Sequence, residues 1–385
     1  MMLWRRVAAA LLAVACAQEL GGNETNGTAL EVVERDEDAV TMACVTWNMA
    51  ALCPSPRDCK FLASLRHHSV ICVGVQELED LKPRRAEGHR SVRWTEALRR
   101  AFPEKKFYKV ADHAAGPVRL AVFVNKAAPV TVRDCAVGDV ACGIGNIVRN
   151  KGCSAAFLEL GVPGGAKGDA RRAPVRLCLV AAHLAAHAGK VADRNADYWR
   201  IARELAAQAP DAWRGGGGGL GGGGADVLDM SDAGDNSGRA PLLDAADLVV
   251  FSGDLNYRLD LPREEAERGA VAGSLADLLA YDQLKNERAK RRAFTGFLEG
   301  PIRFAPTYKY DKRSDVYDSS KKMRIPSWTD RVLYTPKGPT PRGKRAAPGL
   351  KLTSYDAVAS ARHSDHRPVV ATFRLSPGAP KAPKR

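Results

Sequence analysis

Seven strand-like apolar runs that end in polar residues constrain the fold of this chain more than any other feature of its sequence. Helical patterns fall between several of them, at 94–101, 192–208 and 274–292. This alternation predicts strands packed against helices, and some neighbouring runs are joined too closely for helical crossovers. A mixed α/β sandwich therefore fits better than a single parallel sheet. The predicted strands are 40–48, 70–77, 118–125, 175–183, 248–256, 331–334 and 368–375.

The composition is that of a folded globular protein. The 385 residues can bury a substantial core, and 45% of them are hydrophobic while 26% are charged. No apolar run approaches the roughly 18 residues that a membrane span needs, which excludes a multispan membrane protein. The formal net charge of +14 favours a partner rich in phosphate: nucleic acid, an anionic membrane surface or a phosphorylated small molecule. Charge alone does not choose among these.

The N-terminal residues 1–17 are typical of a secretory signal peptide, with a charged start, a short apolar stretch and small residues at the end. A polar lead-in, 18–39, follows and carries N-glycosylation sequons at Asn23 and Asn26. These features predict a secretory or extracellular location. The alternative is a chance alanine-rich start, which would leave the protein in the cytoplasm and at membrane surfaces.

Residues 40–375 are predicted to form one domain, because parts of one set of motifs lie on both sides of a glycine tract. The tract and the acidic residues after it, 214–246, predict a flexible insertion. A stretch rich in proline and glycine, 336–349, has four basic residues and no acidic one, so we expect a basic surface loop. The end of the chain, 376–385, predicts a disordered basic tail.

The nine cysteines are spread along the chain without CxxC pairs, which argues against a zinc site. Cys44, Cys72 and Cys178, which lie within apolar runs, are expected to be small buried side chains. Two pairs, Cys53 with Cys59 and Cys135 with Cys142, are close enough in sequence to form disulfides in an oxidising compartment. The sequence leaves that question open.

Polar side chains suited to metal or phosphate stand at or near the ends of several predicted strands. Each one alone is a common turn former or capping residue. In a sandwich, however, strand ends gather side chains from distant parts of the sequence into one cleft. A full set in a compatible order therefore indicates one site. The set is Asn48, Glu77, His183, Asp254, Asn256, Asp330, Asp365 and His366.

With these residues, the sequence resembles the inositol polyphosphate 5-phosphatases, within the DNase I-like phosphoesterases. The resemblance implies a four-layer α/β/β/α sandwich of two packed mixed sheets flanked by helices. Departures at Cys153, Ala182, Ser327 and Thr329 are mild and remove no functional group. The matching blocks run in the family's order: TWNMA (46–50), VGVQELED (73–80), GNIVRNKGCSAAFLEL (145–160), AHLAAH with RNADY (182–198), SGDLNYRLD (252–260), EGPIRFAPTYKYD (299–311), KMRIPSWTDRVLY (322–334) and SDHRPV (364–369).

The resemblance implies hydrolysis of a 5-phosphate by direct attack of water, and the sequence has no CX5R loop or other phosphatase nucleophile motif. Asp254 would activate or orient the water, and Asn256 would hold the phosphate or the nucleophile. His366, oriented by Asp330, would stabilise the phosphoryl oxygens. His183 would donate to the phosphate.

The cofactor implied is Mg²⁺, because phosphate hydrolysis needs a cation and hard oxygen ligands suit this one. We expect Glu77 to supply the charged ligand, with Asn48 beside it. Asp365 would support the metal or the groups around it.

A second, basic cluster indicates how the substrate is recognised. Each non-scissile phosphate of an inositol phosphate has to meet Lys or Arg side chains. The resemblance places the 4-phosphate against most of this set, and the remaining members would extend the same pocket. The predicted substrate-binding residues are Tyr308, Lys309, Lys322, Arg324, Lys151 and Arg258.

The expected partner is a phosphoinositide or a soluble inositol polyphosphate, with peripheral contact to an anionic membrane and a monomeric protein. One rival keeps the fold but takes nucleic acid as substrate, which the net charge would suit. The motif PTYKYD together with Lys322 and Arg324 argues against it, so no nucleic acid partner is expected. A second rival is an inactive phosphoinositide-binding module, which would require the loss of a metal-binding or water-handling residue. The sequence shows no such loss.

Overall fold

This computed structural model describes residues 39–53, 55–79, 88–143, 145, 149–162, 173–213, 239–338 and 347–378. The predicted signal peptide and nearly all of the lead-in lie outside these residues. So do most of the glycine-rich insertion, the middle of the basic loop and most of the tail.

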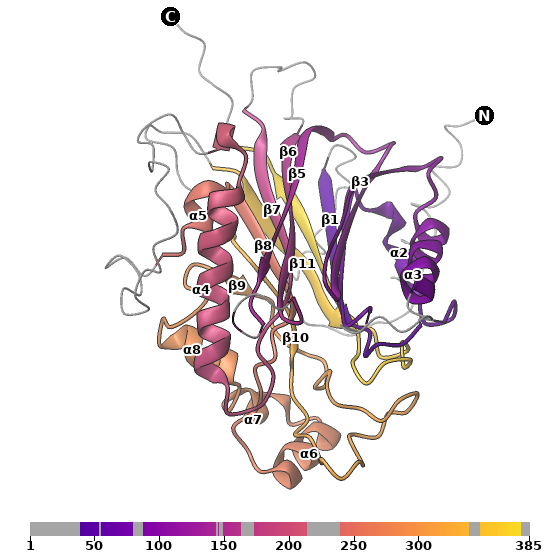
Figure 1. The fold of residues 1–385 in the computed structure, drawn as a ribbon, viewed down its shortest axis with the longest axis vertical. Helices are drawn as coiled ribbons and strands as arrows, with labels where there is room; N and C mark the ends of the chain where they lie inside the picture. Colours follow the sequence, from indigo (N-terminus) through magenta and orange to yellow (C-terminus); the bar gives the residue numbers. More distant parts are fainter. Residues whose placement is uncertain are drawn as a thin grey trace, which may run out of the picture. The chain divides into compact units, whose positions relative to one another are not determined.

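Two six-stranded mixed sheets form the centre of the domain, as Figure 1 shows. The strands β1 and β2 are parallel, as are β7 and β8, and the other pairs are antiparallel. In sheet order, the first sheet contains β11 (Gly349–Ala357), β12 (Val369–Ser376), β1 (Val40–Asn48), β2 (Val70–Gln76), β4 (Val118–Asn125) and β3 (Phe107–Ala115). The second contains β5 (Thr131–Ala141), β6 (Gly152–Gly161), β7 (Val175–His183), β8 (Leu248–Asp254), β10 (Asp330–Tyr334) and β9 (Leu298–Glu299).

Helices cover the outer face of each sheet (Figure 1). The first sheet carries α2 (Phe61–Ser64), the 3₁₀ turn Leu65–His67 and α3 (Gly88–Ala101). The second carries α4 (Val191–Gln208), the 3₁₀ turn Asp211–Trp213 and α5 (Leu242–Ala245). Three further helices lie in the connection from β8 to β9: α6 (Arg263–Ala272), α7 (Leu275–Leu279) and α8 (Gln283–Ala289).

Three apolar clusters show that the domain has four layers. The first lies between the sheets and takes residues from both, for example Met42 and Val250. The second joins α4 to the second sheet through Tyr198, Ile201 and Leu205 on one helical face, together with apolar residues of the strands. The third joins α2 and α3 to the first sheet. The predicted four-layer sandwich is therefore confirmed.

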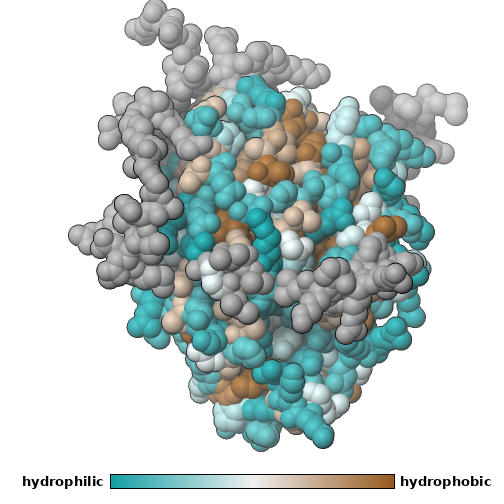
Figure 2. Space-filling model, viewed as in Figure 1, coloured by the Kyte–Doolittle hydropathy of each residue, from teal (hydrophilic) through white to brown (hydrophobic). Residues whose placement is uncertain are grey.

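The visible face of the molecule is mostly hydrophilic, with small separate hydrophobic areas (Figure 2). No helix in the described residues is long and apolar enough to cross a membrane. The eight cysteines among the described residues are all free thiols, so neither of the two disulfides left open by the sequence is present.

The structure corrects the predicted elements in three places. The helix predicted at 274–292 is two helices, because Asp282 begins α8 by accepting a hydrogen bond from the backbone nitrogen of Lys285. The predicted insertion extends too far, since α5 lies within it and buries Leu242 and Leu243. Five strands were not predicted, including β5, whose mixed exposed and half-buried residues hide the alternation.

Candidate active site

The predicted catalytic residues meet at one edge of the sandwich because strand register aligns them. Within the first sheet, Asn48 pairs with Gln76, so Glu77 follows at the same level. Within the second sheet, His183 pairs with Asp254, and Asp254 pairs with Asp330. A hydrogen bond of 2.9 Å from Nδ2 of Asn48 to Oδ2 of Asp254 joins the two sheets at this edge.

Asp254 is the centre of the cluster and is almost completely buried. Its Oδ2 lies 3.3 Å from Nε2 of His183, and its Oδ1 accepts a hydrogen bond of 3.1 Å from the backbone nitrogen of Asn256. Burial would raise the pKa of Asp254, but hydrogen bonding to His183 and the positive charges of His183 and His366 lower it below its usual range. The carboxylate is therefore ionised and held in one orientation.

His366 and Asp330 form a buried pair on the other side of Asp254. Nδ1 of His366 lies 2.9 Å from Oδ2 of Asp330, which also accepts hydrogen bonds from Thr307 (2.7 Å) and Thr329 (3.0 Å). Burial would lower the pKa of His366, but the charge and hydrogen bond of Asp330 and the charge of Asp254 raise it to about 10. The ring is an imidazolium at neutral pH, with Nδ1 committed to Asp330.

A stack of side chains borders this pair. The ring of Tyr308 lies 4.5 Å from that of His366, and the guanidinium of Arg258 lies 4.3 Å from the centre of the Tyr308 ring. Arg258 donates to Oδ1 of Asn256 at 2.6 Å, and Nδ2 of Asn256 donates to the backbone oxygen of Leu184 at 3.0 Å. The amide of Asn256 is thereby fixed between Arg258 and the strand end of His183.

Three more of the predicted substrate-binding residues, Lys309, Lys322 and Arg324, lie in the segment before β10. Nζ of Lys309 is 3.6 Å from Asp318 and 4.0 Å from Asp365. The backbone nitrogen of Arg324 donates to Asp318 at 2.8 Å, while the side chains of Arg324 and Lys322 make no ion pair with any described residue. Lys322 is exposed and Arg324 half-buried, so both can contact an anion.

Lys151 immediately precedes β6 and contacts Nε2 of His183. Burial lowers its pKa, although the charges of Asp254 and Glu77 oppose that effect. Among the described residues, neither Nδ1 of His183 nor Oδ1 of Asp330, both buried, has a hydrogen-bond partner. The centre therefore holds buried polar atoms that no described residue satisfies.

The donor set at Asn48 and Glu77 fits a hard divalent cation. Glu77 leaves β2 with a positive φ of 51°, its side chain is 44% exposed, and its Oε1 lies 3.8 Å from Nε2 of His183. No group of three or more His, Cys, Asp or Glu side chains among the described residues could hold a metal. One carboxylate and one amide oxygen suit Mg²⁺, which keeps several waters and binds substrate phosphate. Asp365 contacts Lys309 and lies 4.0 Å from Nε2 of His366.

Three residues that contact the predicted site residues were missed from the sequence. Thr307 and Thr329 donate to Asp330, and Ser364 donates to the backbone oxygen of Asn48 at 2.6 Å and contacts the backbone nitrogen of His366. All three lie within or next to motif blocks. That position was the only signal, because nothing in a sequence shows which group a buried hydroxyl meets.

Two known proteins have sequences similar to this chain. A synaptojanin of Caenorhabditis elegans is 31% identical over 313 residues, which cover 80% of this chain and 23% of that protein. The type II inositol 1,4,5-trisphosphate 5-phosphatase of Mus musculus is 31% identical over 336 residues, which cover 83% of this chain and 28% of that protein. The chain thus spans about a quarter of the length of these relatives.

Solved structures share the fold. The inositol polyphosphate 5-phosphatase domain of SPsynaptojanin, in complex with inositol (1,4)-bisphosphate and calcium ion, has a TM-score of 0.65 and 25% identity and covers 89% of this chain and 86% of that one. A Cimex nitrophorin has a TM-score of 0.61 at 20% identity, covers 88% of this chain and 99% of that one, and shows the fold alone. These findings confirm the predicted resemblance.

The match to a family model settles the classification. The model describes Endonuclease/Exonuclease/phosphatase family 2, and it matches residues 45–372, which include every predicted site residue. The matched segment begins inside β1 and ends inside β12, so it contains both sheets and the edge where the site lies. The chain therefore belongs to Endonuclease/Exonuclease/phosphatase family 2.

Proposed function

We propose that the protein is a Mg²⁺-dependent phosphatase that removes the 5-phosphate from phosphoinositides or soluble inositol polyphosphates. The observation that carries the proposal is the joined cluster of Asn48, Asp254, Asp330 and His366. Lys322 and Arg324, whose side chains form no ion pair with any described residue, lie in the segment that leads into β10. The names of the similar proteins support the same substrate class. We further propose that it acts as a monomer in peripheral contact with anionic membranes.

The side chains suggest how the reaction proceeds. Asp254, with its lowered pKa, is a weak base, so it orients the attacking water by accepting a hydrogen bond more than by taking a proton from free water. His366 keeps Nδ1 on Asp330 and can donate from Nε2 to a phosphoryl oxygen. Asn256 and His183 border the same position. When Mg²⁺ is bound at Glu77 and Asn48, it neutralises charge on the phosphate.

Phosphate release from a panel of substrates tests the proposal. The panel contains phosphoinositides and inositol phosphates with and without a 5-phosphate, and a DNA duplex with an abasic site. We expect release only from compounds with a 5-phosphate, loss of activity in EDTA, and recovery on addition of Mg²⁺. Preference for the abasic DNA would instead assign the protein to a nuclease branch, and full activity in EDTA would contradict the metal dependence.

A variant at the metal position sharpens this test. Glu77→Gln keeps the side chain's size but removes its charge, so we expect a loss of kcat by orders of magnitude. Because Glu77 is partly exposed and its contact with His183 is long, at 3.8 Å, the melting temperature should stay close to that of the wild type. The matched control is Glu104→Gln, an exposed carboxylate after α3, which should keep full activity.

A further inference from the structure

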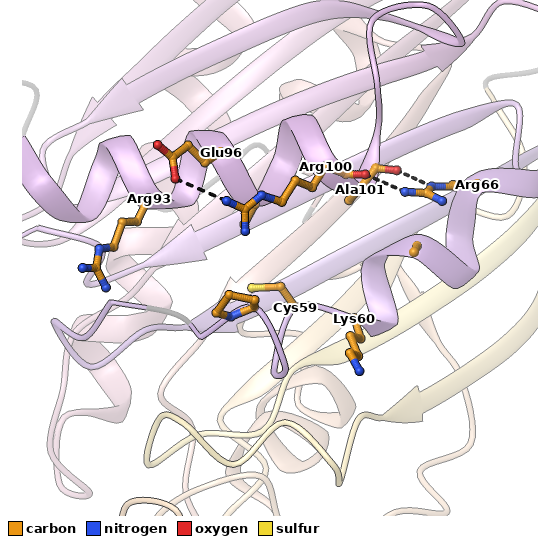
Figure 3. A pocket seen from close by; sticks show the side chains of 10 residues that line it. Cys59, Lys60, Arg66, Arg93, Glu96, Arg100 and Ala101 are labelled. Atoms are coloured by element: carbon orange, nitrogen blue, oxygen red, sulfur yellow. Dashed lines mark hydrogen bonds and ion pairs between the residues drawn. The ribbon is translucent and has the colours of Figure 1, made fainter.

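A groove lies between α2 and α3, on the outer face of the first sheet (Figure 3). None of the candidate catalytic residues lines it. Its volume is about 420 Å³, which is within the range of small-molecule sites. Its walls come from α3 and from the segment that leads into α2, which includes Pro56 and Cys59.

The charge of the groove is strongly one-sided. Lys60, Arg66, Arg93 and Arg100 line it, and Glu96 is the one acidic residue among the lining residues. Glu96 lies 3.8 Å from Arg100, as the dashed line in Figure 3 shows. Lys60 and Arg93 form no ion pair with any described residue.

Arg66 has a different role. Its Nε and Nη2 donate to the backbone oxygens of Ala101 and Arg100, which are the last two residues of α3 (Figure 3). Arg66 therefore holds the end of α3 against the 3₁₀ turn that follows α2. It also satisfies carbonyl groups that the end of α3 leaves free. One wall of the groove is fixed by this contact, while Lys60 and Arg93 stay available.

Small side chains make the groove deep. Ala63 on α2 and Ala97 and Ala101 on α3 occupy positions where larger residues would fill the space between the two helices. Burial and the nearby charge of Asp58 raise the pKa of the Cys59 thiol to about 12, so this wall is neutral. The groove thus combines an apolar floor with basic walls.

We propose that this groove is a second, non-catalytic anion site that binds an inositol phosphate, either free or as the headgroup of a phosphoinositide. Basic groups on both walls suit a ligand with two or more phosphates, since each phosphate then meets its own cation. The small volume of the groove, about 420 Å³, favours such a ligand over a polymer chain. The choice of inositol phosphate rests on the proposed function, whereas the preference for a polyanion rests on the groove itself.

Calorimetry with inositol 1,4-bisphosphate tests the proposal, because this probe has no 5-phosphate to be removed. We expect the wild type to bind two molecules. The double variant Lys60→Ala/Arg93→Ala should weaken one of the two sites at least tenfold, since two charge-assisted contacts are lost. The double variant Lys322→Ala/Arg324→Ala should weaken the other site and leave the groove unchanged.

Two further variants distinguish binding in the groove from a general effect of surface charge. Arg99→Ala/Lys105→Ala removes the same charge from exposed positions at the end of α3 and just after it, outside the groove, and should keep both sites. Ala97→Phe fills the groove without changing its charge and should abolish the groove site alone. A single site in the wild type, or equal loss in the Arg99/Lys105 control, would overturn the proposal.

Vesicles distinguish the two sources of the ligand. Phosphatidylcholine vesicles with and without phosphatidylinositol 4-phosphate are sedimented with each variant. If Lys60→Ala/Arg93→Ala no longer sediments with the vesicles that contain phosphatidylinositol 4-phosphate, the groove binds the lipid headgroup. If it still sediments with them but has lost binding of inositol 1,4-bisphosphate, the groove binds the free compound. Release of phosphate from inositol 1,4,5-trisphosphate should be unchanged in this variant. If the wild type released none, the proposed function would fail while the binding result stood.

Discussion

His366 keeps its positive charge because Asp330 is locked beside it. Asp330→Asn removes the negative charge at nearly constant size, so the pKa of His366 falls, although the charge of Asp254 still raises it, and a larger fraction of the rings is neutral at pH 7. We expect kcat at neutral pH to fall about 10²–10³-fold, as when a charge-stabilising donor is lost, and to recover as the pH is lowered. The pH profile of kcat measures this.

The control for that variant acts on the same carboxylate without removing its charge. Thr307→Val deletes one hydrogen bond to Oδ2 of Asp330. The wild-type enzyme should stay active until the pH approaches about 10, where His366 loses its proton, and Thr307→Val should keep a profile of that shape. A profile of Asp330→Asn parallel to that of the wild type would show that Asp330 does not set the charge of His366.

We expect selectivity for substrates with a 4-phosphate to depend on Lys322 and Arg324. Their side chains have no ion-pair partner among the described residues. Replacing both with Ala removes contacts worth about 1.5–3 kcal/mol each. We expect kcat/KM to fall at least tenfold for a substrate with 4- and 5-phosphates and to change little for one with a 5-phosphate and no 4-phosphate. Equal losses on both substrates would mean that the pair supports the fold or the scissile phosphate.

At the scale of elements, Asp282 connects α8 to β10. It begins the helix and also accepts two hydrogen bonds, of 2.9 and 3.1 Å, from Nη1 of Arg331, the residue after Asp330. Both side chains are almost completely buried. Asp282→Ala would leave the Arg331 charge with Glu299 alone, so we expect a loss of about 3–5 kcal/mol in the free energy of unfolding.

Urea unfolding measures that loss, and the exposed Lys290 at the end of the same helix provides the control. Nζ of Lys290 lies 3.5 Å from Oε1 of Glu287, but the side chain of Lys290 is more than half exposed. Lys290→Ala should therefore cost less than about 1 kcal/mol. If Asp282→Ala cost no more than Lys290→Ala, the buried pair would not be what secures α8 to the sheet.

Elements differ in how far their sequence determines them. All seven predicted strands are present, because each is buried and apolar over most of its length. The strands β3 and β5 were missed since their half-exposed faces carry charged residues, and their strand state depends on pairing with β4 and β6. The predicted site residues lie together because strand ends share an edge. Their hydroxyl partners could not be predicted, because those contacts depend on how the two sheets meet.

Both the stability of the molecule and the geometry of the site depend on how closely the two sheets approach each other. A Cβ added to Gly74 in β2 would lie 2.6 Å from Cβ of Ala181 in β7, a distance that the packed layers do not tolerate. Gly74→Ala should therefore separate the sheets locally and destabilise the fold by about 1–3 kcal/mol. Because Asn48 lies on one sheet and Asp254 on the other, the same wedge should also reduce kcat.

The exchange of both residues is the decisive measurement. In Gly74→Ala/Ala181→Gly the added methyl group occupies the space that the removed one leaves, so the sheets can return to their original separation. We expect the double variant to recover most of the melting temperature and most of the kcat lost by Gly74→Ala, beyond what adding the separate effects of the two substitutions gives. If Gly74→Ala alone lowered neither quantity, or the exchange gave no recovery, contact between the sheets would not control the geometry of the site.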